Sequence, residues 1–132
     1  MTAFVDTSAL YAVLARDDRN HGRAAAAWRT AIEAGEELVT TNYVLLETLA
    51  LAQSRLGMKA VRAVVDDVTP ALTVEWIDPD DHRNAVLALV AAGRRRLSLV
   101  DCSSFEVMRR LRIRRAFAYD KHFAEQGFEM LR

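Results

Sequence analysis

The sequence predicts a single α/β domain in which a five-strand parallel sheet is covered by helices on both faces. Short apolar runs alternate with longer segments of helical period along the whole chain, which is the pattern typical of such sheets. The chain has 132 residues, 52% hydrophobic and 27% charged, which is enough for one core and excludes a disordered chain. We find no linker, repeat or low-complexity stretch, so residues 1–132 form one predicted domain.

The first third of the chain supplies two strands and two helices. Residues 3–5 form a buried strand, and residues 7–15 continue as a helix whose apolar side chains share one face. The Ala-rich segment 22–34 makes a second helix that ends at Gly35, and residues 37–40 form the second strand.

The middle of the chain is predicted to be mostly helical. Asn42 can cap a long helix that reaches Leu56, where Gly57 supplies the stop. A further helix covers residues 58–68, and residues 72–77 form the third strand.

The last third begins with a well-marked helix. Asp78 is a plausible N-cap with Pro79 at the first helical position, and the helix runs to Ala92. The remaining predicted elements are a helix that starts at residues 100–103, a strand at 116–119, a helical turn at 122–125 and a strand at 128–131.

Glu47 is the most unusual acidic residue. It is the only charged residue between Leu38 and Ser54, and helical spacing places it on one stripe with Tyr43 and Leu51. We therefore expect it to point inward. A buried carboxylate without a partner costs several kcal/mol, so a nearby cation is expected, with an arginine partner as the structural alternative.

Three aspartates lie at the ends of predicted elements. Asp6 and Asp120 directly follow strands, and Asp101 starts a helix. Helix capping is the alternative explanation for Asp6 and Asp101. The carboxyl ends of parallel strands meet at one edge of a sheet, so we expect these aspartates and Glu47 to share one shallow cleft. Two carboxylates about 5 Å apart disfavour each other by roughly 3 kcal/mol at an effective dielectric near 20, so the cluster must hold protons or cations.

The ligand types favour Mg²⁺ or Mn²⁺ over zinc. Carboxylate oxygens suit the first two ions, whereas zinc prefers Cys and His. His21, His82, His122 and the single Cys102 are too scattered in the sequence to suggest a zinc site. One cysteine allows no internal disulfide and makes the cytoplasm the expected compartment. The longest uncharged stretch, residues 84–93, is too short for a membrane span.

Several motifs, in this order, resemble the PIN-domain family and, at this chain length, its VapC-type toxins. They are the opening segment Val5-Asp6-Thr7-Ser8-Ala9-Leu10, the isolated Glu47, Asp101 at a helix start, and the closing segment Phe117-Ala118-Tyr119-Asp120-Lys121-His122-Phe123. The likeness covers essentially the whole chain.

The resemblance implies a sheet order of 3-2-1-4-5 and a type II toxin, a metal-dependent endoribonuclease that hydrolyses phosphodiester bonds in RNA. A cognate VapB-type antitoxin and a homodimer are expected with it. It also implies that Asp6, Glu47, Asp101 and Asp120 are the catalytic residues and the ligands of Mg²⁺ or Mn²⁺. Thr7 and Ser104 would orient ligands or water.

A basic segment is the predicted RNA-binding surface. Residues 94–115 contain eight arginines against two acids, and the arginines near the end of this segment avoid the apolar stripe of their helix. We expect them to form a basic rim beside the metal site; an ordinary solvated surface is the alternative. The predicted RNA-binding residues are Arg109, Arg110, Arg112, Arg114 and Arg115.

Two other functions remain open at this point. One is a PIN nuclease of RNA processing outside toxin–antitoxin systems. The other is a non-catalytic, receiver-like module that binds Mg²⁺, which requires a lysine near the acids; Lys121 is the only candidate.

Overall fold

Five parallel strands form one sheet in the order β3-β2-β1-β4-β5 in the computed structural model, which describes residues 1–131. The strands are β1 (Thr2–Val5), β2 (Glu37–Thr41), β3 (Thr73–Glu75), β4 (Arg115–Phe117) and β5 (Glu129–Met130). The predicted fold class and strand order are confirmed. The last three strands are shorter than the apolar runs that predicted them.

The central strand fixes where the carboxyl ends of the sheet come together. Ala3, Phe4 and Val5 are fully buried, as expected of a parallel strand covered on both faces. Val5 pairs in register with Phe117 of β4. The residues that follow these two partners therefore leave the sheet side by side at the same edge.

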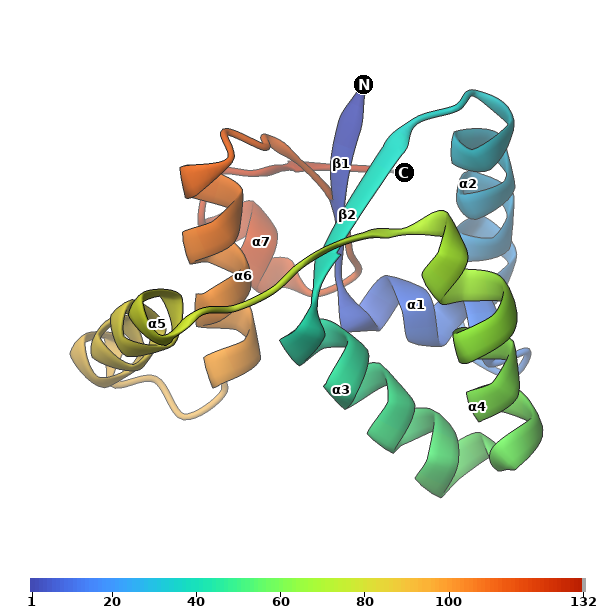
Figure 1. The fold of residues 1–132 in the computed structure, drawn as a ribbon, viewed down its shortest axis with the longest axis horizontal. Helices are drawn as coiled ribbons and strands as arrows, with labels where there is room; N and C mark the ends of the chain where they lie inside the picture. Colours follow the sequence, from blue (N-terminus) through green and yellow to red (C-terminus); the bar gives the residue numbers. More distant parts are fainter. Residues whose placement is uncertain (132) are drawn as a thin grey trace.

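Seven α-helices within residues 1–131 cover the sheet. They are α1 (Thr7–Leu14), α2 (His21–Glu33), α3 (Asn42–Leu51), α4 (Met58–Ala63), α5 (Pro79–Ala92), α6 (Leu99–Arg110) and α7 (Lys121–Glu125). In Figure 1, α2 and α4 lie on one side of β1 and β2, and α5 and α6 lie on the other.

Two predicted helices are interrupted. The helix expected to reach Leu56 keeps α geometry only to Leu51 and ends in a π-helical turn, η1 (Ala52–Leu56). The helix expected over residues 58–68 ends in a second π turn, η2 (Val64–Val68), which a 3₁₀ turn, η3 (Thr69–Ala71), follows.

The cap of α3 also differs from the prediction. Thr41 at the end of β2 is the N-cap, because its hydroxyl accepts a hydrogen bond from the Val44 N–H at 3.1 Å. Asn42 instead accepts from the Ile77 N–H at 2.7 Å and so ties α3 to the segment after β3. The predicted Asp78 cap of α5 is confirmed.

A cluster of aromatic rings holds the short helix α7 in place. The fully buried Phe123 ring lies 4.9 Å from Phe105, 6.3 Å from Phe4 and 6.4 Å from Phe128, measured between centroids. Because α7 has only five residues, this packing rather than helix propensity fixes the residues at its start.

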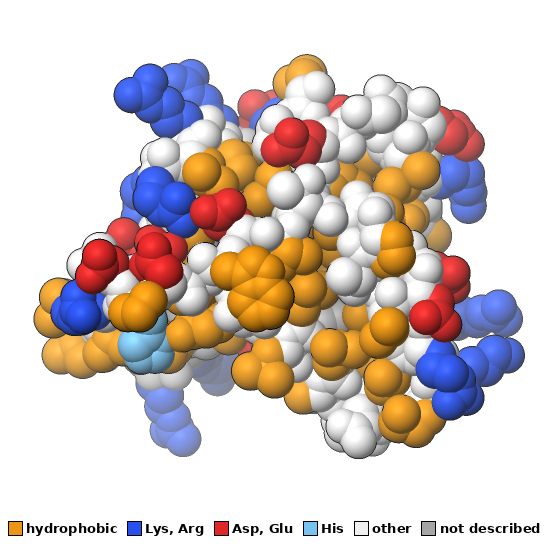
Figure 2. Space-filling view, in the orientation of Figure 1, with side chains coloured by type: hydrophobic (Ala, Val, Ile, Leu, Met, Phe, Trp, Pro, Cys, Tyr) orange, Lys and Arg blue, Asp and Glu red, His pale blue; other side chains and the backbone are white. Residues whose placement is uncertain are grey.

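One face of the molecule is notably apolar. In Figure 2 hydrophobic side chains cover the middle of the view and most arginines and lysines lie at its margins. Large apolar residues that are exposed in the structure include Leu46, Met58, Val65 and Trp76. Within residues 1–131, no helix is long and apolar enough to cross a membrane.

Candidate metal centre

All four predicted acids line one cavity of about 490 Å³ at the carboxyl ends of β1 and β4. Asp6 follows β1, and Asp120 follows β4 after two further residues. Asp101 comes from the first turn of α6 and Glu47 from α3. The convergence that strand ends and helix starts predicted is therefore present in the structure.

Asp6 links the ends of the two central strands. It caps α1, and one carboxylate oxygen accepts hydrogen bonds from the Ser8 N–H at 3.1 Å and the Ser8 hydroxyl at 2.6 Å. The Ser8 hydroxyl in turn accepts from the Tyr119 N–H at 2.9 Å. Ser8, which the sequence analysis did not single out, therefore fixes the Asp6 side chain against the end of β4.

Asp101 lies inside the helix that it was expected to start. Ser98 is the N-cap of α6, and Asp101 is three residues further on, in a reciprocal capping box. The Asp101 N–H donates to the Ser98 hydroxyl at 3.0 Å, and the Ser98 N–H donates to one Asp101 oxygen at 3.3 Å. This arrangement uses one oxygen of a carboxylate that is 6% exposed.

Asp120 has a histidine beside it. Its Oδ1 atom caps α7 by accepting from the His122 N–H at 2.9 Å, and it lies 3.9 Å from His122 Nε2. The buried His122 ring is oriented through Nδ1, which lies 2.9 Å from Glu125 Oε1. Potential ligand atoms of Asp101, Asp120 and His122 all lie within 4.8 Å of one another.

The sequence analysis considered the histidines only as zinc ligands and gave His122 no place in the acidic cluster. The ring belongs to the acidic cluster although no other histidine or cysteine is near it in the sequence. The signal that could have found it is the Asp-x-His spacing of Asp120 and His122 at a helix start, since a helix cap brings its second successor back toward its own side chain.

The acids occupy an unfavourable environment when ionised. Burial raises the pKa of Asp6 from its ordinary 3.8 to about 7, with hydrogen bonds from Ser8 opposing and the charges of Asp101 and Asp120 adding to the rise. Burial and, second to it, the neighbouring Asp120 charge raise the pKa of Asp101 from its ordinary 3.8 to about 6. A divalent cation would remove this penalty, so the donor set and its electrostatics fit an ion that prefers oxygen ligands.

Glu47 faces the cavity rather than the core. Its side chain is half-buried and lines the cavity, while Val44 and Thr48 occupy the buried face of α3. The expectation of a buried carboxylate is therefore corrected: Glu47 is half-buried and lines the same cavity as the three aspartates.

The two predicted supporting residues have different positions. Thr7 lines the cavity, and its hydroxyl lies 3.5 Å from the Val44 carbonyl, to which it donates. Ser104 is fully buried and does not line the cavity, and its hydroxyl has no hydrogen-bond partner within residues 1–131, so its role in orienting ligands or water stays a prediction. Ser8 and Ser98 hold the aspartates.

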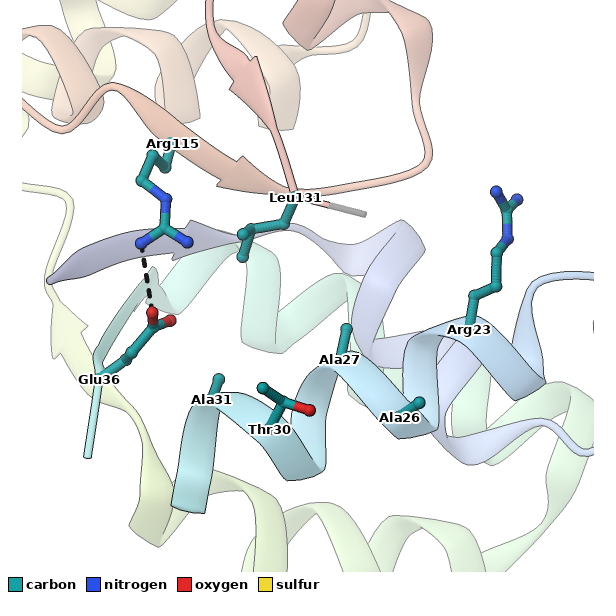
Figure 3. Close-up of a pocket in the computed structure, with 8 residues that line it drawn as sticks. All are labelled: Arg23, Ala26, Ala27, Thr30, Ala31, Glu36, Arg115 and Leu131. Carbon is teal, nitrogen blue, oxygen red and sulfur yellow. Dashed lines mark hydrogen bonds and ion pairs between the residues drawn. The ribbon is translucent and has the colours of Figure 1, made fainter. Parts of the chain in front are cut away.

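The five predicted RNA-binding arginines do not lie beside the acidic cavity. Because α6 runs away from the carboxyl edge of the sheet, residues at its end and beyond lie at the opposite edge, and none of the five predicted arginines lines the acidic cavity. Arg110 pairs with Glu75 at 3.1 Å and with Asp81 at 3.0 Å. Arg115 reaches Glu36 at 3.4 Å across a separate pocket beside α2 (Figure 3).

Three other arginines do line the acidic cavity. They are Arg19, Arg55 and Arg96. Arg96 belongs to the basic segment 94–115 but was not among the predicted RNA-binding residues, and the sequence analysis gave Arg19 and Arg55 no role. Lys121 is exposed and is not among the lining residues, so the structure does not supply the lysine that a receiver-like module requires.

Comparison with known proteins gives one consistent family. The PIN domain family matches residues 3–129. The 23S rRNA-specific endonuclease VapC20 of Mycobacterium tuberculosis is 35% identical over 130 residues, which is 98% of this chain and 97% of that protein.

Solved structures agree with this family. The crystal structure of M. tuberculosis VapC20, described as a sarcin-ricin loop cleaving toxin, superposes with a TM-score of 0.84 at 34% identity and covers 97% of this chain and 96% of its own. FitAcB from Neisseria gonorrhoeae superposes with a TM-score of 0.70 at 11% identity over 100% of this chain and 97% of its own, which shows the shared fold.

Proposed function

The chain belongs to the PIN-domain family, and from this membership we propose that it is a metal-dependent endoribonuclease and the toxin of a type II toxin–antitoxin pair. The observation that carries the proposal is the convergence of Asp6, Glu47, Asp101 and Asp120 in one cavity. The near-full-length likeness to an endonuclease toxin supports it.

Each of the three aspartates has one carboxylate oxygen left for a cation. One oxygen of each accepts a hydrogen bond from a backbone N–H at the start of a helix: Ser8 for Asp6, Ser98 for Asp101 and His122 for Asp120. A carboxylate has two oxygens, so each aspartate is fixed by one and keeps the other for a ligand. We propose Mg²⁺ or Mn²⁺ as that ligand, with Glu47 and His122 as additional donors.

The chain's own groups prepare the site for attack on a phosphodiester. A bound divalent cation lowers the pKa of water and offsets the negative charge of the phosphate. Glu47 lines the cavity with a half-buried side chain and can accept a proton from an incoming water. Ser8 and Ser98 keep the carboxylates of Asp6 and Asp101 in fixed positions, so little reorganisation is needed when the substrate enters.

The RNA target can be proposed by similarity. VapC20 is named for cleavage of 23S rRNA and its structure for the sarcin-ricin loop, and we propose that this chain also cuts a structured loop of ribosomal RNA. Intact ribosomes incubated with the protein and Mn²⁺ should yield one discrete rRNA fragment by primer extension. Scattered cuts, or cleavage of messenger RNA only, would contradict the proposed target.

A VapB-type antitoxin and a second copy of the chain are the proposed partners, and the cytoplasm is the proposed compartment. The exposed apolar residues on the face of Figure 2 support a protein partner. The wild-type chain should arrest growth when expressed alone, and the product of a short adjacent reading frame should relieve the arrest. Light scattering of the purified chain at micromolar concentration tests the dimer.

Cleavage of a mixed single-stranded RNA pool tests the activity itself. We expect cutting by the wild type with Mg²⁺ or Mn²⁺, none in EDTA, and a loss of at least 100-fold in Asp6→Asn and Glu47→Gln, in line with the removal of groups that act together. Asp78→Asn is the matched control, because Asp78 is an exposed helix cap outside the cavity. Cutting that persists in EDTA or in both acidic variants would overturn the proposal.

A further inference from the structure

We propose that Arg19, Arg55 and Arg96 form a phosphate-binding rim that holds the RNA backbone across the acidic cavity. The inference rests on the proposed ribonuclease function and assigns the surface that binds the substrate. We call these three residues the cavity arginines.

The cavity arginines come from three separate segments that surround one opening. Arg19 belongs to the connection between α1 and α2, Arg55 to the π turn η1, and Arg96 to the connection between α5 and α6. All three are exposed and line the same cavity as the acids. Such an arrangement presents cations around the mouth of a site whose inner residues are anionic.

The negative charge of the cavity explains why RNA binding needs cations around its opening. Five carboxylates line the cavity: Asp6, Asp18, Glu47, Asp101 and Asp120. An RNA strand is itself a polyanion, so it is repelled from these acids unless cations meet the phosphates on either side of the scissile bond. The arginines that the sequence favoured for this task lie at the other edge of the sheet.

The cavity arginines are available for an external anion. Within residues 1–131 none of them forms an ion pair, whereas Arg83, Arg94, Arg110 and Arg115 are each paired with carboxylates. A guanidinium without a carboxylate partner keeps its planar set of donors for phosphate oxygens, which it can bind with two hydrogen bonds.

Local structure fixes the backbone that carries Arg19. The Asn20 N–H donates to the Asp18 carboxylate at 2.8 Å, and the His21 N–H donates to the Asp18 carbonyl at 3.0 Å. The His21 ring, through Nδ1, lies 2.8 Å from the Ala12 carbonyl. Arg19 is therefore displayed from an ordered turn.

The other two cavity arginines are also held by their neighbours. The guanidinium of Arg55 lies over the Tyr11 ring, 5.7 Å from its centroid, which leaves the edge of the guanidinium free for phosphate. Arg96 stands between the helix stop at Gly93 and the Ser98 cap, and its neighbour Leu97 is buried. Arg55 therefore loses less side-chain freedom on binding than a mobile surface arginine, and Arg19 and Arg96 extend from ordered backbone.

The test compares two triple variants with equal charge. Arg19, Arg55 and Arg96 are replaced by Ala in one protein, and the exposed arginines Arg16, Arg29 and Arg62, which lie outside the cavity, are replaced in the other. Binding of a fluorescent single-stranded RNA pool is followed by anisotropy with Ca²⁺ in place of Mg²⁺, over a series of NaCl concentrations. A gel confirms that the RNA stays intact, and melting temperatures confirm that both variants fold.

We expect the cavity triple to weaken binding at least tenfold at low salt. The slope of log K against log[salt] should fall by about 2, because each lost phosphate contact to a single strand contributes about 0.7. The control triple should stay within twofold of the wild type. Arg→Lys at the three cavity positions should restore most of the binding, since the charge is retained.

The outcomes separate this inference from the proposed function. Equal losses in both triples, an unchanged cavity triple, or a wild type that binds no RNA would overturn the rim. If the wild type cuts RNA but the two triple variants bind RNA with equal affinity, the proposed nuclease activity is supported and the phosphate-binding rim is refuted. If the wild type binds RNA through the cavity arginines but does not cleave it with Mg²⁺ or Mn²⁺, the phosphate-binding rim is supported and the proposed nuclease activity is refuted.

Discussion

Replacing Asp6 by Asn should stabilise the protein when no metal is present. The folded-state pKa of about 7, against 3.8 for the ordinary carboxyl, corresponds to a cost of about 4 kcal/mol for keeping Asp6 ionised above pH 7. Asn retains the oxygen that accepts from Ser8 and is as good a helix cap as Asp. A buried amide has a desolvation cost of its own, so we expect a net gain of about 2 kcal/mol.

The gain should depend on pH in a defined direction. Because the folded-state pKa of Asp6 is raised, the native protein binds more protons than the unfolded chain between about pH 4 and pH 7. Wild-type stability therefore falls as pH rises through this window and is level above it. The advantage of Asp6→Asn should be small at pH 4, grow up to pH 7 and then stay constant.

Thermal and urea unfolding in EDTA at pH 4, 6 and 8 measure this effect. For a chain of this size, 2 kcal/mol corresponds to a rise of about 7 °C in Tm. Asp78→Asn, which changes an exposed cap outside the acidic cluster, should leave Tm within about 2 °C. A Tm that falls in Asp6→Asn, or a gain of equal size at pH 4 and pH 8, would refute the electrostatic account and leave Asp6 as a structural cap.

Three further results are expected. Mn²⁺ should raise the Tm of the wild type at pH 7.5 but not that of Asp6→Asn or Asp101→Asn, because only the wild type gains the binding energy of the ion; an equal rise in all three proteins would place the ion elsewhere. His122→Ala should weaken Mn²⁺ binding by about 10- to 100-fold in calorimetry, the usual effect of losing a ligand or its immediate support, and unchanged affinity would exclude His122 from the site. Phe123→Ala should lower the free energy of unfolding by about 3–5 kcal/mol, because it empties the centre of the aromatic cluster; a loss under 1 kcal/mol in urea unfolding would show that this cluster does not anchor α7.

The acidic cavity could be predicted because its position follows from chain direction. Asp6 and Asp120 come at or soon after the ends of strands, and in a parallel sheet all such ends share one edge. The positions of Asp6, Asp101 and Asp120 could therefore be predicted from the order of elements alone, which apolar periodicity provides, whereas Glu47 was identified as the lone charge on the apolar stripe of its helix. No side-chain geometry had to be known in advance.

The arginines could not be predicted in the same way. Local spacing correctly places Arg109 and Arg110 off the buried stripe of α6, and both residues are exposed. Helix direction decides which edge of the sheet they reach, and here α6 takes them away from the cavity. Arg19, Arg55 and Arg96 are brought together by two connections and a π turn, and no sequence periodicity marks such segments.

Capping and metal binding are compatible explanations for the aspartates, although the sequence analysis treated them as alternatives. One oxygen of Asp6 binds the amide of its helix, and the other remains for the cavity. The partial positive charge of a helix N-terminus also favours a carboxylate there, so the fold offsets part of the cost of gathering the acids. Asp6→Ala removes the cap as well as the charge and should be less stable than Asp6→Asn by about 1 kcal/mol, whereas both variants should lose Mn²⁺ binding. The difference in unfolding free energy between these two variants therefore measures the contribution of the helix cap, and the loss of Mn²⁺ binding that they share measures the contribution of Asp6 to the metal site.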